Sequence, residues 1–136
     1  RAFIGSCTNG RLDDLRRRLT ENYAIVREAL NPLDGVEVFA MEGTFIAWID
    51  LRGRWGIPLA ARSAPAYDRP APRRDISKEF GRAARRNGVW LSEGTQFGPE
   101  GHGFMRINFA TNEERLREGL NRCVAALEAF DHRATE

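Results

Sequence analysis

The stretch GHGFMRINFA, residues 101–110, decides the fold class that this sequence predicts. From residue 104 onward apolar and polar side chains largely alternate, which indicates a β-strand because successive residues of a strand point to opposite faces of a sheet. One face of the predicted strand 104–110 is apolar and holds Met105, Ile107 and Phe109. The other face holds Phe104, Arg106 and Asn108. We therefore expect the strand to pack on a core through one face, with Arg106 pointing away from that core.

The segments on either side of this strand predict a loop before it and a helix after it. The loop contains four glycines, Gly94, Gly98, Gly101 and Gly103. Because a strand and not a helix follows them, they lack the context of a dinucleotide-binding fingerprint, and we interpret them as a loop that needs positive φ at several positions. Thr111 and Glu114 then have the spacing of a capping box. The helix that they begin is apolar on one side, at Leu116, Leu120, Cys123, Leu127 and Phe130.

Residues 10–30 carry the strongest helical pattern in the chain. Apolar side chains recur there at spacings of three and four and form one stripe, made of Leu12, Leu15, Leu19, Tyr23, Val26 and Leu30. We expect Asp13 and Asp14 to lie in the first turn, where negative charge suits the helix dipole.

Two strands, 36–41 and 44–50, are expected next, joined at Glu42-Gly43 in a hairpin with a tight turn. The second of them is apolar on both faces, so we expect both faces to be covered.

The middle of the chain predicts an irregular loop at 52–75, which holds four of the six prolines, followed by a helix. Asp75 is expected to cap that helix at 76–86, and Asn87-Gly88 to end it. Residues 89–91 predict a short strand. The predicted order α-β-β-α-β-β-α indicates an α+β fold, a mostly antiparallel sheet with helices packed on it.

Length and composition predict one domain and exclude some function classes. The chain has 136 residues and a net charge of +2. We divide it into an N-terminal segment of uncertain origin (1–10), the domain (11–131) and a tail (132–136). Its arginines are offset by 19 acidic residues, so nucleic-acid binding is not expected. No segment could span a membrane. The two cysteines form no CxxC pair, which favours a reduced, cytoplasmic protein.

Arg106 is the best single candidate for a binding residue. A cation in the middle of a strand needs water, an acidic partner or a ligand, because burying it unpaired is costly. Its planar guanidinium suits a carboxylate. His102 is expected to be an exposed loop residue, and His132 inert. Asp50 and Glu93 end predicted strands without being marked as a catalytic pair, so no catalytic, cofactor-binding or metal-binding residue is assigned.

Residues 12–130 resemble the C-terminal small domain of fold-type-I pyridoxal-phosphate enzymes, the cystathionine β-lyase-like C–S lyases and the class I–II aminotransferases. The resemblance rests on four stretches in the family's order: EGTFIAWID (42–50), NGV (87–89), GTQFG (94–98) and GHGFMRINFA (101–110). It implies an α+β small domain in a homodimeric parent enzyme acting on amino acids. It also implies that Arg106, as the arginine of the final stretch, binds the substrate α-carboxylate.

The resemblance also implies what this chain lacks. The family's Schiff-base lysine, pyridine-nitrogen aspartate and phosphate-binding residues precede the matching region, in a large domain. Lys78 is the only lysine and falls outside the family's lysine motif. We therefore expect the chain alone to bind no pyridoxal phosphate and to have no activity. A non-catalytic binding or dimerisation module is the alternative.

A second resemblance concerns residues 3–16, FIGSCTNGRLDDLR. They are similar to the cluster-ligand segment of the aconitase and isopropylmalate isomerase large subunits, which implies an iron–sulfur role for Cys7. A cluster held by three thiolates needs two more cysteines, and the chain has one, Cys123. We interpret Cys7 as a lone loop cysteine or as the junction of two coding sequences. A fragment of an iron–sulfur hydro-lyase remains the second alternative.

Overall fold

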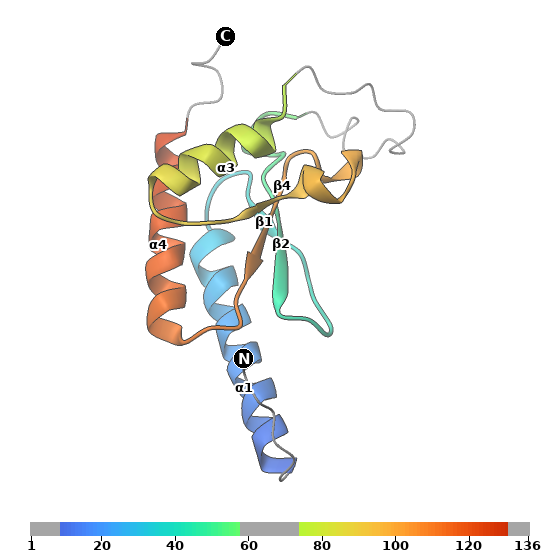
Figure 1. The fold of residues 1–136 in the computed structure, drawn as a ribbon, viewed down its shortest axis with the longest axis vertical. Coiled ribbons are helices and arrows are strands. Elements are labelled where there is room, and N and C mark those ends of the chain that lie inside the picture. Colours follow the sequence, from blue (N-terminus) through green and yellow to red (C-terminus); the bar gives the residue numbers. More distant parts are fainter. Residues whose placement is uncertain (1–8, 58–73, 131–136) are drawn as a thin grey trace.

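The computed structural model describes residues 9–57 and 74–130, and shows a four-stranded antiparallel sheet with helices packed on it (Figure 1). The expected α+β class is therefore confirmed. Several expectations lie outside the described residues: the segment 1–8 with Cys7, most of the loop 52–75, and the tail 132–136 with His132.

The described elements follow one another along the chain with short strands and longer helices. They are α1 (Asn9–Leu30), β1 (Glu37–Val38), β2 (Ile46–Asp50), α3 (Ile76–Arg86), β3 (Ser92–Glu93), the 3₁₀ turns η2 (Gly94–Phe97) and η3 (Pro99–Gly101), β4 (Phe104–Asn108) and α4 (Glu113–Ala129). In the sheet the strands lie in the order β1-β2-β4-β3. β4, which comes from the stretch 101–110, is thus an inner strand.

The register of β4 separates the two faces of the sheet. Ile107 pairs with Ala47 and Met105 with Ile49, and all four side chains are buried. Helices α1, α4 and α3 pack over this face (Figure 1). The largest fully buried side chains include Phe80 of α3 and Leu120 of α4. The face of β4 that holds Arg106 therefore lies opposite the core, as the alternation predicted.

The N-cap of α3 is the residue that the sequence predicted, whereas the N-cap of α4 lies one residue later than predicted. α3 has the predicted bounds, and the Asp75 carboxylate accepts a hydrogen bond from the Lys78 amide at 3.1 Å. For α4 the expected cap at Thr111 was wrong. Asn112 caps the helix by accepting from the Arg115 amide at 2.9 Å. The Thr111 amide donates instead to the Phe109 carbonyl at 2.8 Å, so the chain is still turning at that residue.

The strands are shorter than predicted, because neighbouring turns use their backbone groups. β1 covers Glu37–Val38 rather than 36–41, and pairing continues only through the Phe39 amide, which donates to the Trp48 carbonyl. A wider loop therefore joins β1 to β2, and the tight turn expected at Glu42-Gly43 was wrong. β3 begins at Ser92, not at residue 89, because the Val89 amide is still bonded to the Ala84 carbonyl of α3 at 3.0 Å.

Helix α1 also departs from two expectations. Its first turn holds no acidic residue, because Asp13 and Asp14 lie one turn further on. There they form ion pairs with arginines three residues later in the chain. The apolar stripe is buried only in its second half: Val26 and Leu30 are fully buried, but Leu12 and Leu15 are 52% and 46% exposed. The first half of α1 extends beyond the sheet (Figure 1), so none of the described elements covers it.

Candidate functional site

Arg106 lies in the middle of β4 on the face opposite the core. The register places it beside Trp48 of β2 on one side and Ser92 of β3 on the other. Its neighbours Met105 and Ile107 are buried in the core, whereas Arg106 is half-buried. A side chain one residue out of phase with the core face must emerge on the opposite one.

Two aromatic rings hold the Arg106 guanidinium. Its Cζ lies 3.9 Å from the centroid of the Phe97 ring and 5.3 Å from that of Trp48. The two rings also contact each other edge to face, with centroids 5.8 Å apart and an interplanar angle of 77°. A guanidinium over an aromatic face gains about 0.5–2 kcal/mol, more when it is desolvated. Phe97 and Trp48 therefore stabilise the cation without neutralising it.

The Arg106 guanidinium has no acidic partner within residues 9–57 and 74–130. It forms no ion pair or side-chain hydrogen bond there, and its Nε is buried without a hydrogen-bond acceptor. The two Nη groups are not buried in this way, so they keep access to solvent. Leaving a charged donor unsatisfied is costly. The Arg106 guanidinium thus has no anionic partner among the described residues.

An open pocket of about 310 Å³ lies beside Arg106. Its lining is formed by the loop between β1 and β2 and by the outward face of the sheet: Phe39, Ala40, Met41, Glu42, Thr44, Ile46, Trp48 and Arg106. Both faces of β2 were expected to be covered, but on this side Ile46 and Trp48 are only half-buried. The pocket lining thus combines apolar side chains with one cation, Arg106, and one carboxylate, Glu42.

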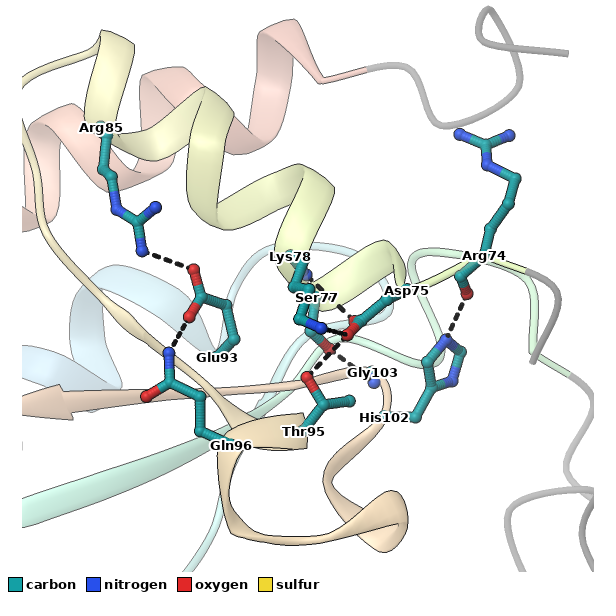
Figure 2. Close-up of polar contacts among 10 residues, drawn as sticks. All are labelled: Arg74, Asp75, Ser77, Lys78, Arg85, Glu93, Thr95, Gln96, His102 and Gly103. Carbon is teal, nitrogen blue, oxygen red and sulfur yellow. Dashed lines mark hydrogen bonds and ion pairs between the residues drawn. The ribbon is translucent and has the colours of Figure 1, made fainter. Parts of the chain in front are cut away.

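The Gly-rich loop that carries Phe97 is packed tightly against the start of β4. Gly98 and Gly103 have φ values of 131° and 88°, which favour glycine, as the loop's composition predicted. Gly94 and Gly101 are needed for a different reason, because their backbones approach too closely for a side chain. The buried hydroxyl of Ser77 in α3 accepts a hydrogen bond from the Gly103 amide at 2.9 Å (Figure 2).

Polar contacts fix the two residues that precede Phe97. The Thr95 hydroxyl donates to the carboxylate of Asp75, at the start of α3, at 2.9 Å. The Gln96 amide donates to Glu93, which in turn pairs with Arg85 of α3 at 2.6 Å (Figure 2). Phe97 is therefore held through α3, although its own ring is 54% exposed. Sequence reasoning did not identify Phe97 or Trp48, whose only signal was their place in the GTQFG and FIAWID stretches.

The other candidates have structural partners. Asp50 is buried and pairs with Arg52 at 2.7 Å, and Glu93 is buried against α3 with Arg85. Each carboxylate is thus paired with its own arginine. His102 is half-buried rather than exposed, with its Nε2 3.2 Å from the Arg74 carbonyl oxygen. Lys78 is largely exposed on α3 and pairs with Asp75 at 3.5 Å.

Neither a metal centre nor a membrane span is found in the described part of the chain. Residues 9–57 and 74–130 contain no group of three or more histidine, cysteine, aspartate or glutamate side chains placed to bind a metal ion. None of the helices described there has the length and apolar character needed to cross a bilayer.

Known proteins resemble this chain over most of its length. A Mycobacterium leprae protein named as a cystathionine β-lyase is 32% identical over 124 residues, which is 88% of this chain and 28% of that protein. The cystathionine β-lyase of Corynebacterium glutamicum is 31% identical over 119 residues, 85% of this chain and 26% of the relative. The aspartate aminotransferase of Pyrococcus horikoshii is 25% identical over 125 residues, 86% of this chain and 25% of the relative. No family model matches.

Solved structures share the fold. A Rhizobium meliloti aspartate aminotransferase superposes with a TM-score of 0.68 at 21% identity, over 93% of this chain and 29% of its own. A Corynebacterium diphtheriae protein described as a pyridoxal-phosphate-dependent β-cystathionase gives a TM-score of 0.62 at 24% identity, over 90% of this chain and 28% of its own.

The relatives are much longer than the matching region. The chain spans between 25% and 28% of the length of the curated relatives named above. None of these relatives supports the resemblance of residues 3–16 to the iron–sulfur hydro-lyases. In sequence and in fold, the chain matches the C-terminal part of the pyridoxal-phosphate-dependent cystathionine β-lyases and aminotransferases.

Proposed function

We propose that this chain supplies the substrate-carboxylate site of a pyridoxal-phosphate-dependent C–S lyase or aminotransferase acting on amino acids. In this proposal Arg106 binds the α-carboxylate of the amino acid. The observation that carries it is the unpaired guanidinium beside an open pocket, since it contacts aromatic rings but forms no ion pair with any described acid, Glu42 of the same pocket included. A hydrogen bond to a charged group contributes about 1.5–3 kcal/mol, enough to orient a small substrate.

The residues of this chain do not fit covalent attachment of the cofactor. A Schiff base needs a lysine at the substrate site, and the only lysine, Lys78, is exposed on α3 and engaged by Asp75. Lys78 is not among the residues that line the Arg106 pocket. The cofactor would then be held by residues outside this chain, and the chain alone would bind carboxylates without catalysing their conversion.

The exposed leucines of α1 also support the proposal that this chain works together with further protein outside it. Leu12 and Leu15 continue the stripe that is buried further along the helix, yet no described element covers them. Exposed apolar positions that continue a buried stripe are typical of surfaces that pack against further protein. The relatives, about four times longer than the matching region, contain such further protein. We propose that the first half of α1 packs against it.

The carboxylate role can be tested on the chain itself with two amino-acid probes. L-alanine and L-alaninamide differ in the carboxylate, and each can be titrated at constant ionic strength while the arginine side chains are followed by NMR. We expect L-alanine, and not L-alaninamide, to shift the Arg106 signals, and Arg106→Ala to abolish the response. Equal responses to the two probes, or an unchanged response in the Arg106→Ala variant, would contradict the proposal.

A further inference from the structure

We infer that Phe97 is a positioning residue for the carboxylate site, and that with Trp48 it makes Arg106 present its two Nη groups, not Nε, to the ligand. This inference rests on the proposed function, because it concerns how the same guanidinium meets its carboxylate. A guanidinium can bind a carboxylate end-on through both Nη groups or side-on through Nε and one Nη. The two modes place the ligand differently, so the choice between them orients the substrate.

The two kinds of nitrogen in the Arg106 guanidinium differ in burial. Nε of Arg106 is buried without an acceptor, and no other buried side-chain nitrogen or oxygen of the described residues lacks one. A ligand would need to displace the surrounding side chains to reach it. The Nη groups are open, and the pocket lies on their side of the sheet. Only the end-on mode is therefore available without rearrangement.

Two aromatic rings pack against the Arg106 guanidinium. The Phe97 ring lies 3.9 Å from the guanidinium carbon and Trp48 is 5.3 Å away. Phe97 comes from η2 and Trp48 from β2, so two separate parts of the chain contact the cation. Packing at this distance keeps the guanidinium plane fixed, and it compensates in part for the unpaired donor. Without Phe97, Nε would become accessible and the plane could turn.

Phe97 is not free to move away from Arg106. Thr95 and Gln96, the two residues before it, are bonded to Asp75 and Glu93 (Figure 2). Gly98 follows it with a backbone conformation that other residues rarely adopt. An exposed ring that served only as surface would not need anchoring on both sides. The loop therefore sets the position of Phe97, and Phe97 sets the orientation of Arg106.

The test uses sodium acetate as the probe, with the side-chain NMR signals of Arg106 as the readout. In the unaltered chain, acetate should shift the Nη signals of Arg106 more than the Nε signal, whose proton should be displaced by the ring current of Phe97. Phe97→Leu should remove the ring-current displacement, let acetate shift Nε, and weaken binding about fivefold, the equivalent of about 1 kcal/mol. Phe97→Tyr should keep the ring-current displacement, the small response of Nε to acetate and the affinity of the unaltered chain.

The controls separate the two proposals. Phe45→Leu makes the same chemical change at another half-exposed phenylalanine outside the Arg106 pocket, and should change neither signal nor affinity. If Arg106→Ala abolishes acetate binding but Phe97→Leu binds acetate as the unaltered chain does, the positioning role is wrong and the carboxylate site stands. If acetate shifts Nε more than Nη in the unaltered chain, the end-on mode is wrong. If acetate does not bind, the proposed function fails and the positioning role fails with it.

Discussion

Gly94 and Gly101 lie against each other so closely that neither has room for a side chain. A Cβ on Gly101 would come within 2.0 Å of the Gly94 carbonyl oxygen, and one on Gly94 within 2.2 Å of the Gly101 carbonyl oxygen. The contact joins the beginning of η2, the turn that ends at Phe97, to the end of η3, the turn that leads into β4. The Gly-rich loop is therefore closed by backbone packing.

Replacing Gly101 with alanine should open this loop. The new Cβ must push the Gly94 backbone away, and overpacking of this kind costs about 1–3 kcal/mol. We expect chemical denaturation to show that loss, together with a change in the Trp48–Phe97 ring contact seen by NMR. Gly43→Ala is the matched control, since nothing lies within 4 Å of its added Cβ. Equal stability of the two variants would contradict the packing argument.

The buried amide of Asn22 should be important for stability. Its Nδ2 donates to the carbonyls of Phe109 and Thr111, each at 2.8 Å, and so ties α1 to the chain between β4 and α4. Asn22→Ala would leave those carbonyls without this donor, at a cost of about 1–3 kcal/mol in the free energy of unfolding. Thr20→Ala, which removes a hydroxyl that bonds within the exposed part of the same helix, should cost less. Urea denaturation of both variants provides the comparison.

The two halves of α1 should respond differently to substitution. Leu15→Lys places a charge on an exposed position and should change the stability of the isolated chain by no more than about 0.5 kcal/mol. Val26→Ala removes buried methyl groups of the same helix and should cost about 1–3 kcal/mol. Thermal unfolding measures both. A large loss for Leu15→Lys would show that the first half of α1 packs within this chain.

Stability should fall at alkaline pH because of Cys123. Burial raises the pKa of this thiol from 9.0 to about 12. The folded state thus keeps a proton on Cys123 that the unfolded state loses. The contribution of the protonated thiol to the free energy of unfolding is therefore fully present below pH 9 and is lost as the pH rises towards 12. Between pH 9 and 12 the free energy of unfolding should fall by about 1.4 kcal/mol per pH unit. Cys123→Ala should remove this part of the slope; identical pH profiles for the two proteins would refute the assignment.

The isolated chain should show no pyridoxal-phosphate-dependent lyase activity. Its only lysine is engaged by Asp75 on α3 and lies outside the Arg106 pocket. Incubation with pyridoxal phosphate and cystathionine, followed by borohydride reduction and peptide mapping, tests this. We expect no turnover and no stoichiometric adduct. Specific modification of Lys78 accompanied by turnover would show that the chain holds its cofactor by itself.

The sequence predicted those features that local patterns determine. The alternation around Arg106 gave the face on which it lies, and Asp75 with Asn87-Gly88 gave the bounds of α3 to the residue. Strand ends and turns were predicted less well, because they depend on which backbone groups a neighbouring element has already bonded. The Val89 amide, taken by the end of α3, is one such case.

The surroundings of Arg106 could not be read from the sequence. Phe97 and Trp48 are 49 residues apart in the chain, and neither stands at a spacing from Arg106 that implies contact. Their meeting depends on the sheet register and on the anchoring of the Gly-rich loop to α3. The same holds for His102, whose partial burial against the Arg74 carbonyl follows from that anchoring.

The alternation along β4 has a consequence for how such a domain could diversify. Met105 and Ile107 pack in the core, while Arg106 and its ring neighbours occupy the opposite face. Substitutions that reshape the pocket can therefore accumulate on one face without disturbing the packing that keeps the strand in place. An insertion or deletion of one residue within β4 would instead exchange the two faces, and would lose fold and binding together. Related sequences can therefore change which ligand the pocket prefers by substituting residues on the Arg106 face of β4, but not by changing the length of β4.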